Sequence, residues 1–294
     1  MIRPLIIALC ALTASGAAAA EKPVVAAVNY PLAYFAERLG GDAVEVAFPV
    51  PADRDPAFWR PSLADVAAFQ KADVIALNGA GYAVWTTKAS LPRSRLVDTS
   101  AAFKSDYIQT ETITHSHGAD GEHSHEGVAS HVWLDFALAA RQADALAKAM
   151  KRRIPELADA VDAAAPALAA DLAALDDAAE SAAAALGDAP IIASHPRYQY
   201  FARAYGLDIR SMEWAAGEAP SDAEWDALEK LVAETGARVL IWEADPPAEA
   251  RARAEAMGLS DVVLPVLANR PVQGDFTSAM REGLERLAAL APTQ

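Results

Sequence analysis

The segment from Pro155 to Leu186 constrains the fold most, because it is a long helix-forming stretch between two series of shorter elements. Its composition shifts sharply to Ala, Leu, Asp and Glu, which favours a helix. A helix from about Pro166 to Leu186, with Pro166 in its first turn, would be ~30 Å long at ~1.5 Å per residue. We therefore expect a rigid connector between two lobes; an ordinary surface helix is the alternative.

Strand-like and helical patterns alternate on both sides of this segment. Strand-like runs cover residues 22–29, 44–50, 74–78, 189–194, 207–212, 238–243 and 262–267, and helical patterns cover residues 31–39, 63–70, 134–150, 197–205, 221–235, 247–257 and 276–290. Ser221 and Glu224 have the spacing of a capping box. The alternation predicts parallel sheets with helical crossovers. We predict an α/β fold of two Rossmann-like lobes, residues 21–160 and 188–294, joined by a long rigid helix over residues 161–187.

The first twenty residues have the pattern of a secretory signal peptide. Arg3 gives a positive start, an apolar core follows from Pro4 to Leu12, and small residues lead to Ala20. This pattern predicts cleavage near Ala20 and export to the periplasm, the alternative being a retained N-terminal anchor. Cys10 is the only cysteine and would be removed with the signal peptide, so disulfides and thiolate metal sites are not expected in the mature chain.

Length and charge restrict the partners. Removing 20 of the 294 residues leaves 274, which is long for one hydrophobic core and suits two domains. The formal net charge of −15 becomes −16 when Arg3 is removed. This acidity argues against nucleic acid and anionic membrane surfaces as partners, and it is compatible with attracting cations. It equally suits a role in solubility alone.

Histidines are concentrated in one polar stretch. Five of the six lie between residues 115 and 131, and only His195 stands apart. Histidine is the commonest metal ligand, and imidazole suits zinc, copper and nickel. Residues 104–130 have no apolar period and are rich in polar residues, which predicts a loop. We expect a His-rich loop, residues 115–126, that attracts metal ahead of a structural site completed by His195; a disordered linker with incidental histidines is the alternative.

Short motifs along the mature chain carry a family resemblance. They begin at Asn29, Asp55, Ala72, His131, Ser194, Glu218 and Gly274. In this order, with the His-rich loop before His131 and the Ala-rich helix before His195, the chain resembles the zinc and manganese solute-binding proteins of bacterial ABC importers, the ZnuA- and TroA-like group. The resemblance implies two α/β lobes joined by one long helix, with a metal ion bound in the cleft between them.

The resemblance fails at two ligand positions. The family usually has histidine directly after an Asp-Pro pair, where this chain has Ala57, and it tends to carry an aspartate in the last lobe, where this chain has Ala268-Asn269. The resemblance then leaves only His131 and His195 of four expected ligands. Zinc sites need about four ligands, or three and a water, so two imidazoles are insufficient for tight binding.

Three sources could supply the missing ligands. Glu243 lies at the end of an apolar strand, where ligands of α/β sheets gather; Asp275 or Asn269 could approach from the last lobe; and the loop could fold in. The candidate metal ligands are therefore His131, His195, Glu243 and Asp275, with His115, His117, His123 and His125 as auxiliary ligands in the loop. Each has a structural alternative: Glu243 as a salt-bridged acid, Asp275 as a helix N-cap, and His195 as a hydrogen-bonded core residue.

These observations predict a periplasmic protein that binds a divalent metal, zinc before manganese, and delivers it to an ABC permease of the inner membrane. We expect a monomer, with a periplasmic metallochaperone as a conceivable further partner. The alternative function is a degenerate relative that buffers or passes on metal through its His-rich loop. An enzyme is not expected, because the zinc-hydrolase motif His-Glu-x-x-His is missing: Glu126 follows His125, but no second histidine has the required spacing.

Overall fold

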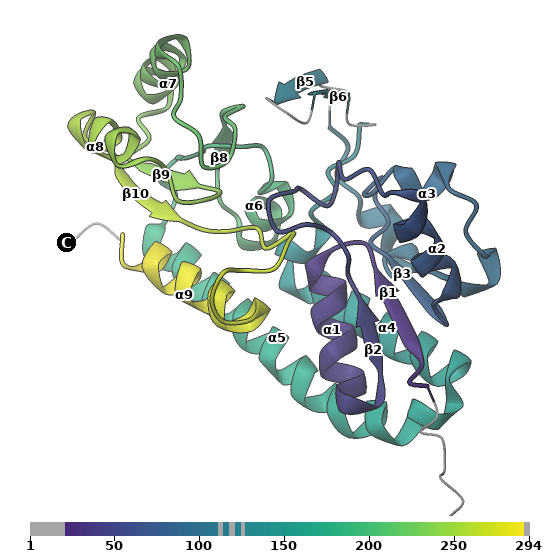
Figure 1. The fold of residues 1–294 in the computed structure, drawn as a ribbon. Helices are drawn as coiled ribbons and strands as arrows, with labels where there is room; N and C mark the ends of the chain where they lie inside the picture. Colours follow the sequence, from purple (N-terminus) through teal and green to yellow (C-terminus); the bar gives the residue numbers. More distant parts are fainter. Residues whose placement is uncertain (1–20, 111–113, 118–120, 125–126, 291–294) are drawn as a thin grey trace, which may run out of the picture.

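The computed structural model describes residues 21–110, 114–117, 121–124 and 127–290. The predicted signal peptide and His125 lie outside these residues. Two lobes with one four-stranded parallel sheet each stand side by side (Figure 1), with strand orders β2-β1-β3-β4 and β10-β9-β7-β8. The predicted α/β fold with two lobes is confirmed.

The N-terminal lobe is built around two central strands, β1 and β3, that are almost fully buried, with the more exposed strands β2 and β4 at the edges of the sheet. Its strands are β1 (Val24–Ala27), β2 (Glu45–Ala47), β3 (Val74–Leu77) and β4 (Leu96–Asp98), and its helices are α1 (Tyr30–Gly40), α2 (Leu63–Lys71), α3 (Trp85–Lys88) and α4 (Phe136–Arg153). Asn29 lies two residues beyond the end of β1 and caps α1, since its side chain accepts a hydrogen bond from the backbone N–H of Leu32 at 3.3 Å. The short elements α3 and β4 escaped the sequence analysis.

The C-terminal lobe repeats this plan. Its strands are β7 (Ile191–Ala193), β8 (Ile209–Ser211), β9 (Val239–Trp242) and β10 (Ser260–Val263), and its helices are α6 (Gln199–Tyr205), α7 (Asp222–Thr235), α8 (Ala248–Ala256) and α9 (Phe276–Ala288). The predicted capping box of Ser221 and Glu224 is present at the start of α7. The strand predicted over residues 262–267 is wrong in its second half. Beyond Val263, Pro265 has no N–H to donate to a ladder, and Leu267 adopts a positive φ of 53°.

Helix α5 (Ala158–Leu186) connects the lobes and runs beneath both of them (Figure 1). It contacts α1 and α4 on one side and α9 on the other. The expected position of Pro166 was wrong, because α5 begins eight residues earlier, at Ala158, and Pro166 lies inside the helix. Proline removes one helical hydrogen bond there. Apolar side chains buried at helical spacing, including Leu168, Leu172 and Leu175, hold the helix together across this defect.

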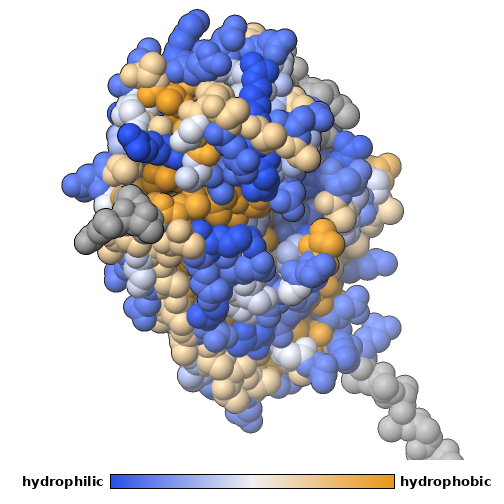
Figure 2. Space-filling model, turned by 90° about the vertical axis from the view of Figure 1, so that its left-hand side faces the viewer, coloured by the Kyte–Doolittle hydropathy of each residue, from blue (hydrophilic) through white to orange (hydrophobic). Residues whose placement is uncertain are grey.

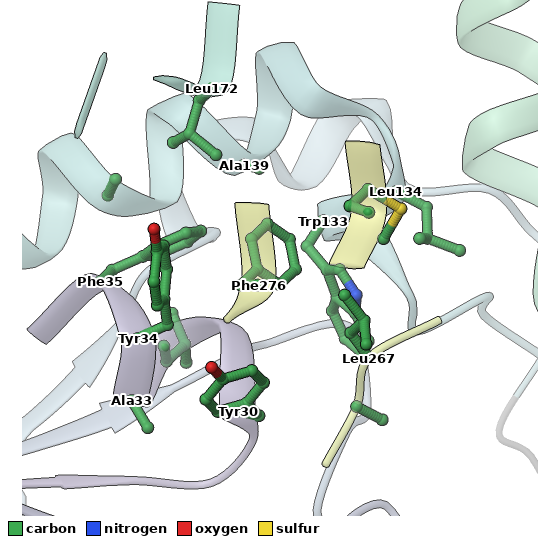
Figure 3. Packing of buried hydrophobic residues seen from close by; sticks show 14 of the residues in the cluster. Tyr30, Ala33, Tyr34, Phe35, Trp133, Leu134, Ala139, Leu172, Leu267 and Phe276 are labelled. Atoms are coloured by element: carbon green, nitrogen blue, oxygen red, sulfur yellow. The ribbon is translucent and has the colours of Figure 1, made fainter. Parts of the chain in front are cut away.

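One hydrophobic core extends through both lobes. Figure 3 shows Phe276, at the start of α9, packed against Tyr34 and Phe35 of α1, with ring centroids 5.7 and 5.9 Å apart. Trp133 lies beside this group, and its indole N–H donates to the carbonyl of Val266 at 2.7 Å. Aromatic rings bury large areas and favour such tilted arrangements. The lobes are therefore packed against each other through side chains in addition to the connecting helix.

The region predicted as a loop, residues 104–130, contains regular structure, so that prediction was wrong in part. Strands β5 (Thr114–His117) and β6 (Gly121–Ser124) pair as an antiparallel hairpin in which His115 is opposite His123. The backbone N–H of Thr110 also donates to the carbonyl of Gly127 at 2.8 Å, below the hairpin. Hairpin pairing uses backbone groups. A hairpin of polar residues has no apolar periodicity, so the hydrophobic pattern of the sequence did not indicate these two strands.

Short 3-10 helices and a polar surface complete the described fold. The 3-10 helices cover Gly41–Ala43, Arg93–Arg95, Ala101–Asp106, Val132–Leu134 and Pro155–Leu157.

Figure 2 shows the face on the side of the C-terminal lobe, where a band of hydrophobic residues lies between two hydrophilic areas. Within the described residues, no helix combines the length and the apolar character needed to cross a bilayer.

The contribution of α5 to stability can be measured at Leu172. This side chain is fully buried in the core, so Leu172→Ala should lower the free energy of unfolding by about 2–5 kcal/mol. Leu63→Ala is the matched control, because Leu63 is 92% exposed and its replacement should change stability by less than about 0.5 kcal/mol. Urea denaturation measures both values. Equal losses in the two variants would contradict the role assigned to α5.

The start of α9 gives a prediction that depends on pH. Burial raises the pKa of Asp275, but hydrogen bonds from the backbone N–H and hydroxyl of Ser278 and from Thr277 outweigh it, so the pKa is lowered overall. Because the pKa of Asp275 is lower in the folded state, its ionised carboxylate stabilises the fold at pH values above its unfolded-state pKa of about 3.9. This stabilisation is lost as the pH falls through the folded-state pKa.

Asp275→Ala should therefore cost about 1 kcal/mol at pH 7 through loss of the cap, and its difference from wild type should shrink below about pH 4. Asp275→Asn serves as the control, because asparagine caps as well as aspartate without a charge. Thermal unfolding measured at several pH values checks this. A difference between wild type and Asp275→Ala that stays constant down to about pH 2 would rule out the charged cap.

Candidate metal centre

A cleft of about 590 Å³ lies between the lobes. The N-terminal lobe lines it with residues 52–56 and Phe58, and the C-terminal lobe lines it with His195, Arg197, Glu243 and the segment 265–272. His195 and Glu243 come together because each follows a strand, β7 and β9 respectively, and these strands are paired in parallel. The carboxyl ends of parallel strands meet at one edge of a sheet, where ligands usually bind.

His195 is held in a single orientation by the backbone. It is 3% exposed, and its Nδ1 lies 2.7 Å from the carbonyl oxygen of Trp214. A carbonyl only accepts hydrogen bonds, so Nδ1 is the donor, and in the neutral form of the ring the lone pair is on Nε2. Metal-binding histidines are typically fixed in this way by a second hydrogen bond. The chemistry of His195 therefore suits a metal ligand that coordinates through Nε2.

His131 is also buried, with 3% exposure, but it is not among the residues that line the cleft. Its ring contacts Trp133, at 4.8 Å between centroids, and Tyr82, at 6.0 Å. Burial raises the pKa of Tyr82 well above its ordinary value, and the negative charge of Asp55 raises it further, while Arg197 opposes both. Tyr82 therefore contacts His131 and lies within electrostatic range of the charged residues of the cleft.

Arg197 is the principal residue that the sequence analysis missed. Its side chain is only 6% exposed, and its Nη2 donates to Oδ2 of Asp55 at 2.8 Å. Its Nε lies 3.7 Å from Oε1 of Glu243, and its guanidinium lies over the ring of Phe58, 5.6 Å from the centroid. The available sequence signal was an arginine two residues after His195, beyond a buried strand. Charged side chains are rarely buried unless they are paired.

Glu243 stands where the sequence analysis expected it, at the end of β9, with its side chain 13% exposed. Burial raises the pKa of its carboxyl group, Arg197 lowers it, and Asp55 raises it again, with a raised value as the result. The backbone N–H of Glu243 donates to the hydroxyl of Ser194 at 3.0 Å. Glu243 therefore forms the ion pair that is expected of a structural acid. It also lines the cleft, as His195 does.

The residues at the other expected ligand positions stabilise the fold. The Asn269 amide donates to the carbonyls of Pro51 at 2.7 Å and Arg54 at 2.9 Å, and so ties the two lobes together. Asp275 caps α9 and does not line the cleft. Ala57 packs against the core, and its neighbour Phe58 lines the cleft. Of His131, His195, Glu243 and Asp275, the structure brings His195 and Glu243 to the cleft wall, where Asn269 also lies with its amide bound to the backbone.

The described residues contain no group of three or more His, Cys, Asp or Glu side chains arranged to hold a metal ion. The auxiliary histidines His115, His117 and His123 lie on the β5–β6 hairpin, which Figure 1 draws away from both sheets. With the side chains as they stand, the cleft offers one oriented imidazole, that of His195, and two carboxylates, Asp55 and Glu243, that are both engaged by Arg197.

Comparisons with solved structures agree with this fold. The chain is similar to the crystal structure of ZnuA, with 24% identity, a TM-score of 0.71, and coverage of 92% of this chain and 100% of that one. It is similar to the Zn(II)-bound ZnuA-like domain of Streptococcus pneumoniae AdcA, with 19% identity, a TM-score of 0.76, and coverage of 92% and 99%. A third similar structure is FpvC of P. aeruginosa in complex with Ni²⁺, with 20% identity, a TM-score of 0.69, and coverage of 92% and 97%.

Among curated proteins, none matches the chain. A family model does match: that of ZnuA, described as the periplasmic zinc-uptake complex component A, over residues 24–290. This match includes both lobes, the connecting helix and the cleft. The chain belongs to the ZnuA family of solute-binding proteins.

Proposed function

We propose that this protein binds a divalent metal ion, zinc in preference to manganese, in the cleft between its lobes and delivers it to an ABC permease of the inner membrane. Export to the periplasm would use the signal peptide of residues 1–20. The observation that carries the proposal is His195, whose Nδ1 is fixed on the carbonyl of Trp214, 2.7 Å away, in a residue that lines the cleft. This leaves Nε2 as the coordinating atom.

The favoured ligand set is His131, His195 and Glu243, completed by water. Two imidazoles and one carboxylate make a three-ligand zinc site with an open position. His131, which does not line the cleft, must reorient to join the set, and Glu243 must leave Arg197. Asp275 is a less favoured fourth ligand, because ligation would remove the cap of α9. Such a site should hold metal more weakly than one with four protein ligands.

Two of the similar structures support a divalent ion as the solute. The AdcA domain is described as Zn(II)-bound, and FpvC is described in complex with Ni²⁺. Both ions suit imidazole nitrogen. Binding would be reversible coordination without chemical change of the solute, in keeping with a family of solute-binding proteins.

A second function, metal buffering by the His-rich hairpin, is favoured by one observation. The register of β5 and β6 places His115 opposite His123, so two of the clustered histidines share one position along the hairpin. Directly opposed residues of an antiparallel pair have Cβ atoms roughly 5 Å apart. Two imidazoles at that spacing can chelate an ion without any residue of the cleft.

Replacing the cleft histidines tests the main proposal. His195→Ala and His131→Ala should each weaken the tight zinc site by about tenfold or more, since each removes one of three protein ligands and even outer-shell changes cost about 10–100-fold. Zinc titration calorimetry measures the affinity, and circular dichroism checks the fold. His123→Ala is the matched control and should leave the tight site unchanged. If both cleft variants retain wild-type affinity and stoichiometry, the cleft is not a metal site.

Deleting residues 115–126 separates the two functions. We expect the number of bound ions to fall while the tight site keeps its affinity, because a hairpin apart from both lobes would lose conformational entropy on serving the cleft as a fixed ligand. Equilibrium dialysis with zinc gives the count, and chelator competition gives the affinity of the tight site. If the tight site collapses on deletion, the loop completes the cleft; restoring histidine with Ala57→His should then rescue binding.

A further inference from the structure

Arg197 links carboxylates from both lobes inside the cleft. Asp55 belongs to the segment between β2 and α2 of the N-terminal lobe, and Glu243 follows β9 of the C-terminal lobe. The Arg197 side chain is only 6% exposed and contacts both of these carboxylates. A guanidinium group stays charged under all relevant conditions. The cleft therefore has a permanent positive charge beside the residues proposed to hold the metal.

The two contacts of the guanidinium are unequal. The Nη2–Oδ2 distance to Asp55 is 2.8 Å and is a hydrogen bond, whereas the Nε–Oε1 distance to Glu243 is 3.7 Å, an ion pair too long for a hydrogen bond. Charge-assisted hydrogen bonds are the stronger kind of contact. When a competing cation enters, Glu243 is therefore the carboxylate that gives up Arg197, while Asp55 keeps it.

A metal ion in this cleft competes with Arg197 in two ways. An ion on His195 would take a carboxylate of the same cleft, and Glu243, which follows the strand paired with that of His195, is one that Arg197 also uses. The ion would share the cleft with the positive charge of Arg197, whose side chain is only 6% exposed. Like charges oppose each other strongly where the effective dielectric constant is low.

We infer that Arg197 is an internal counter-cation that sets the metal affinity of the cleft. Its guanidinium is shared between Asp55 and Glu243 while no metal is bound, and metal binding is an exchange in which the ion takes Glu243 and Arg197 keeps Asp55. This inference rests on the proposed function of the cleft. It assigns to Arg197 a specificity role: only cations that bind imidazole and carboxylate strongly enough to displace the guanidinium are retained.

Replacing Arg197 by a neutral residue of similar length tests the exchange. Arg197→Met should bind zinc about tenfold more tightly than wild type or better, the order expected from removing a nearby like charge. Arg210→Met is the matched control, because Arg210 does not line the cleft and is paired with Asp208 at 3.0 Å on the surface. It should leave the affinity within about twofold. Chelator competition gives the dissociation constants, and circular dichroism verifies folding.

The double variant Arg197→Met/Glu243→Gln identifies the exchanged carboxylate, since the gain in affinity should vanish in it. If Arg197→Met does not fold, Arg197→Gln replaces it with the same expectation, because its amide can still donate to Asp55. A folded neutral variant whose zinc affinity is equal to or below that of wild type overturns the inference. So does a gain that persists without the Glu243 carboxylate.

The inference and the proposed function fail in different ways. If wild-type protein has no His195-dependent zinc site but Arg197→Met gains one, Arg197 is the barrier and the proposed delivery of zinc by the natural chain is wrong. If wild type has that site and Arg197→Met does not strengthen it, the function stands and the role of Arg197 is wrong.

Discussion

The packing of Phe276 against Tyr34 and Phe35 is the interaction on which the arrangement of the cleft depends. It joins the first residue of α9 to α1, and α5 continues the same core beneath both lobes. Trp133 extends it through its hydrogen bond to Val266, a residue that lines the cleft. Since interiors pack at crystal-like density, the two walls of the cleft are positioned by a continuous core and not by a flexible linker.

The regular elements were predictable where local and global signals agree. Buried runs of valine and isoleucine gave the strands, and the capping box of Ser221 and Glu224 marked the start of α7. The errors occurred where tertiary contacts override local pattern. Pro166 lies inside α5 because the flanking leucines are buried on other helices. The β5–β6 hairpin is held by backbone pairing that leaves no apolar period in the sequence.

Two residues of the candidate site could be predicted from the sequence, but the ion pairs that Arg197 forms there could not. His195 and Glu243 could be named because each follows a buried strand, and the structure places both at the cleft wall. Arg197 carried no comparable signal, because a single arginine after a strand usually extends into solvent. Its burial depends on Asp55, 142 residues away in the sequence. Contacts of this range follow from the fold and cannot be deduced from spacing along the chain.

The amide of Asn269 has a consequence for kinetics. By donating to the carbonyls of Pro51 and Arg54, it fastens the rim of one lobe to the other, and the shared core beneath prevents the lobes from swinging apart as rigid bodies. Opening the cleft by rigid-body separation of the lobes would therefore require both hydrogen bonds to break and part of the shared core to come apart. A receiving protein that loosened Asn269 would remove the first of these barriers without unfolding either lobe.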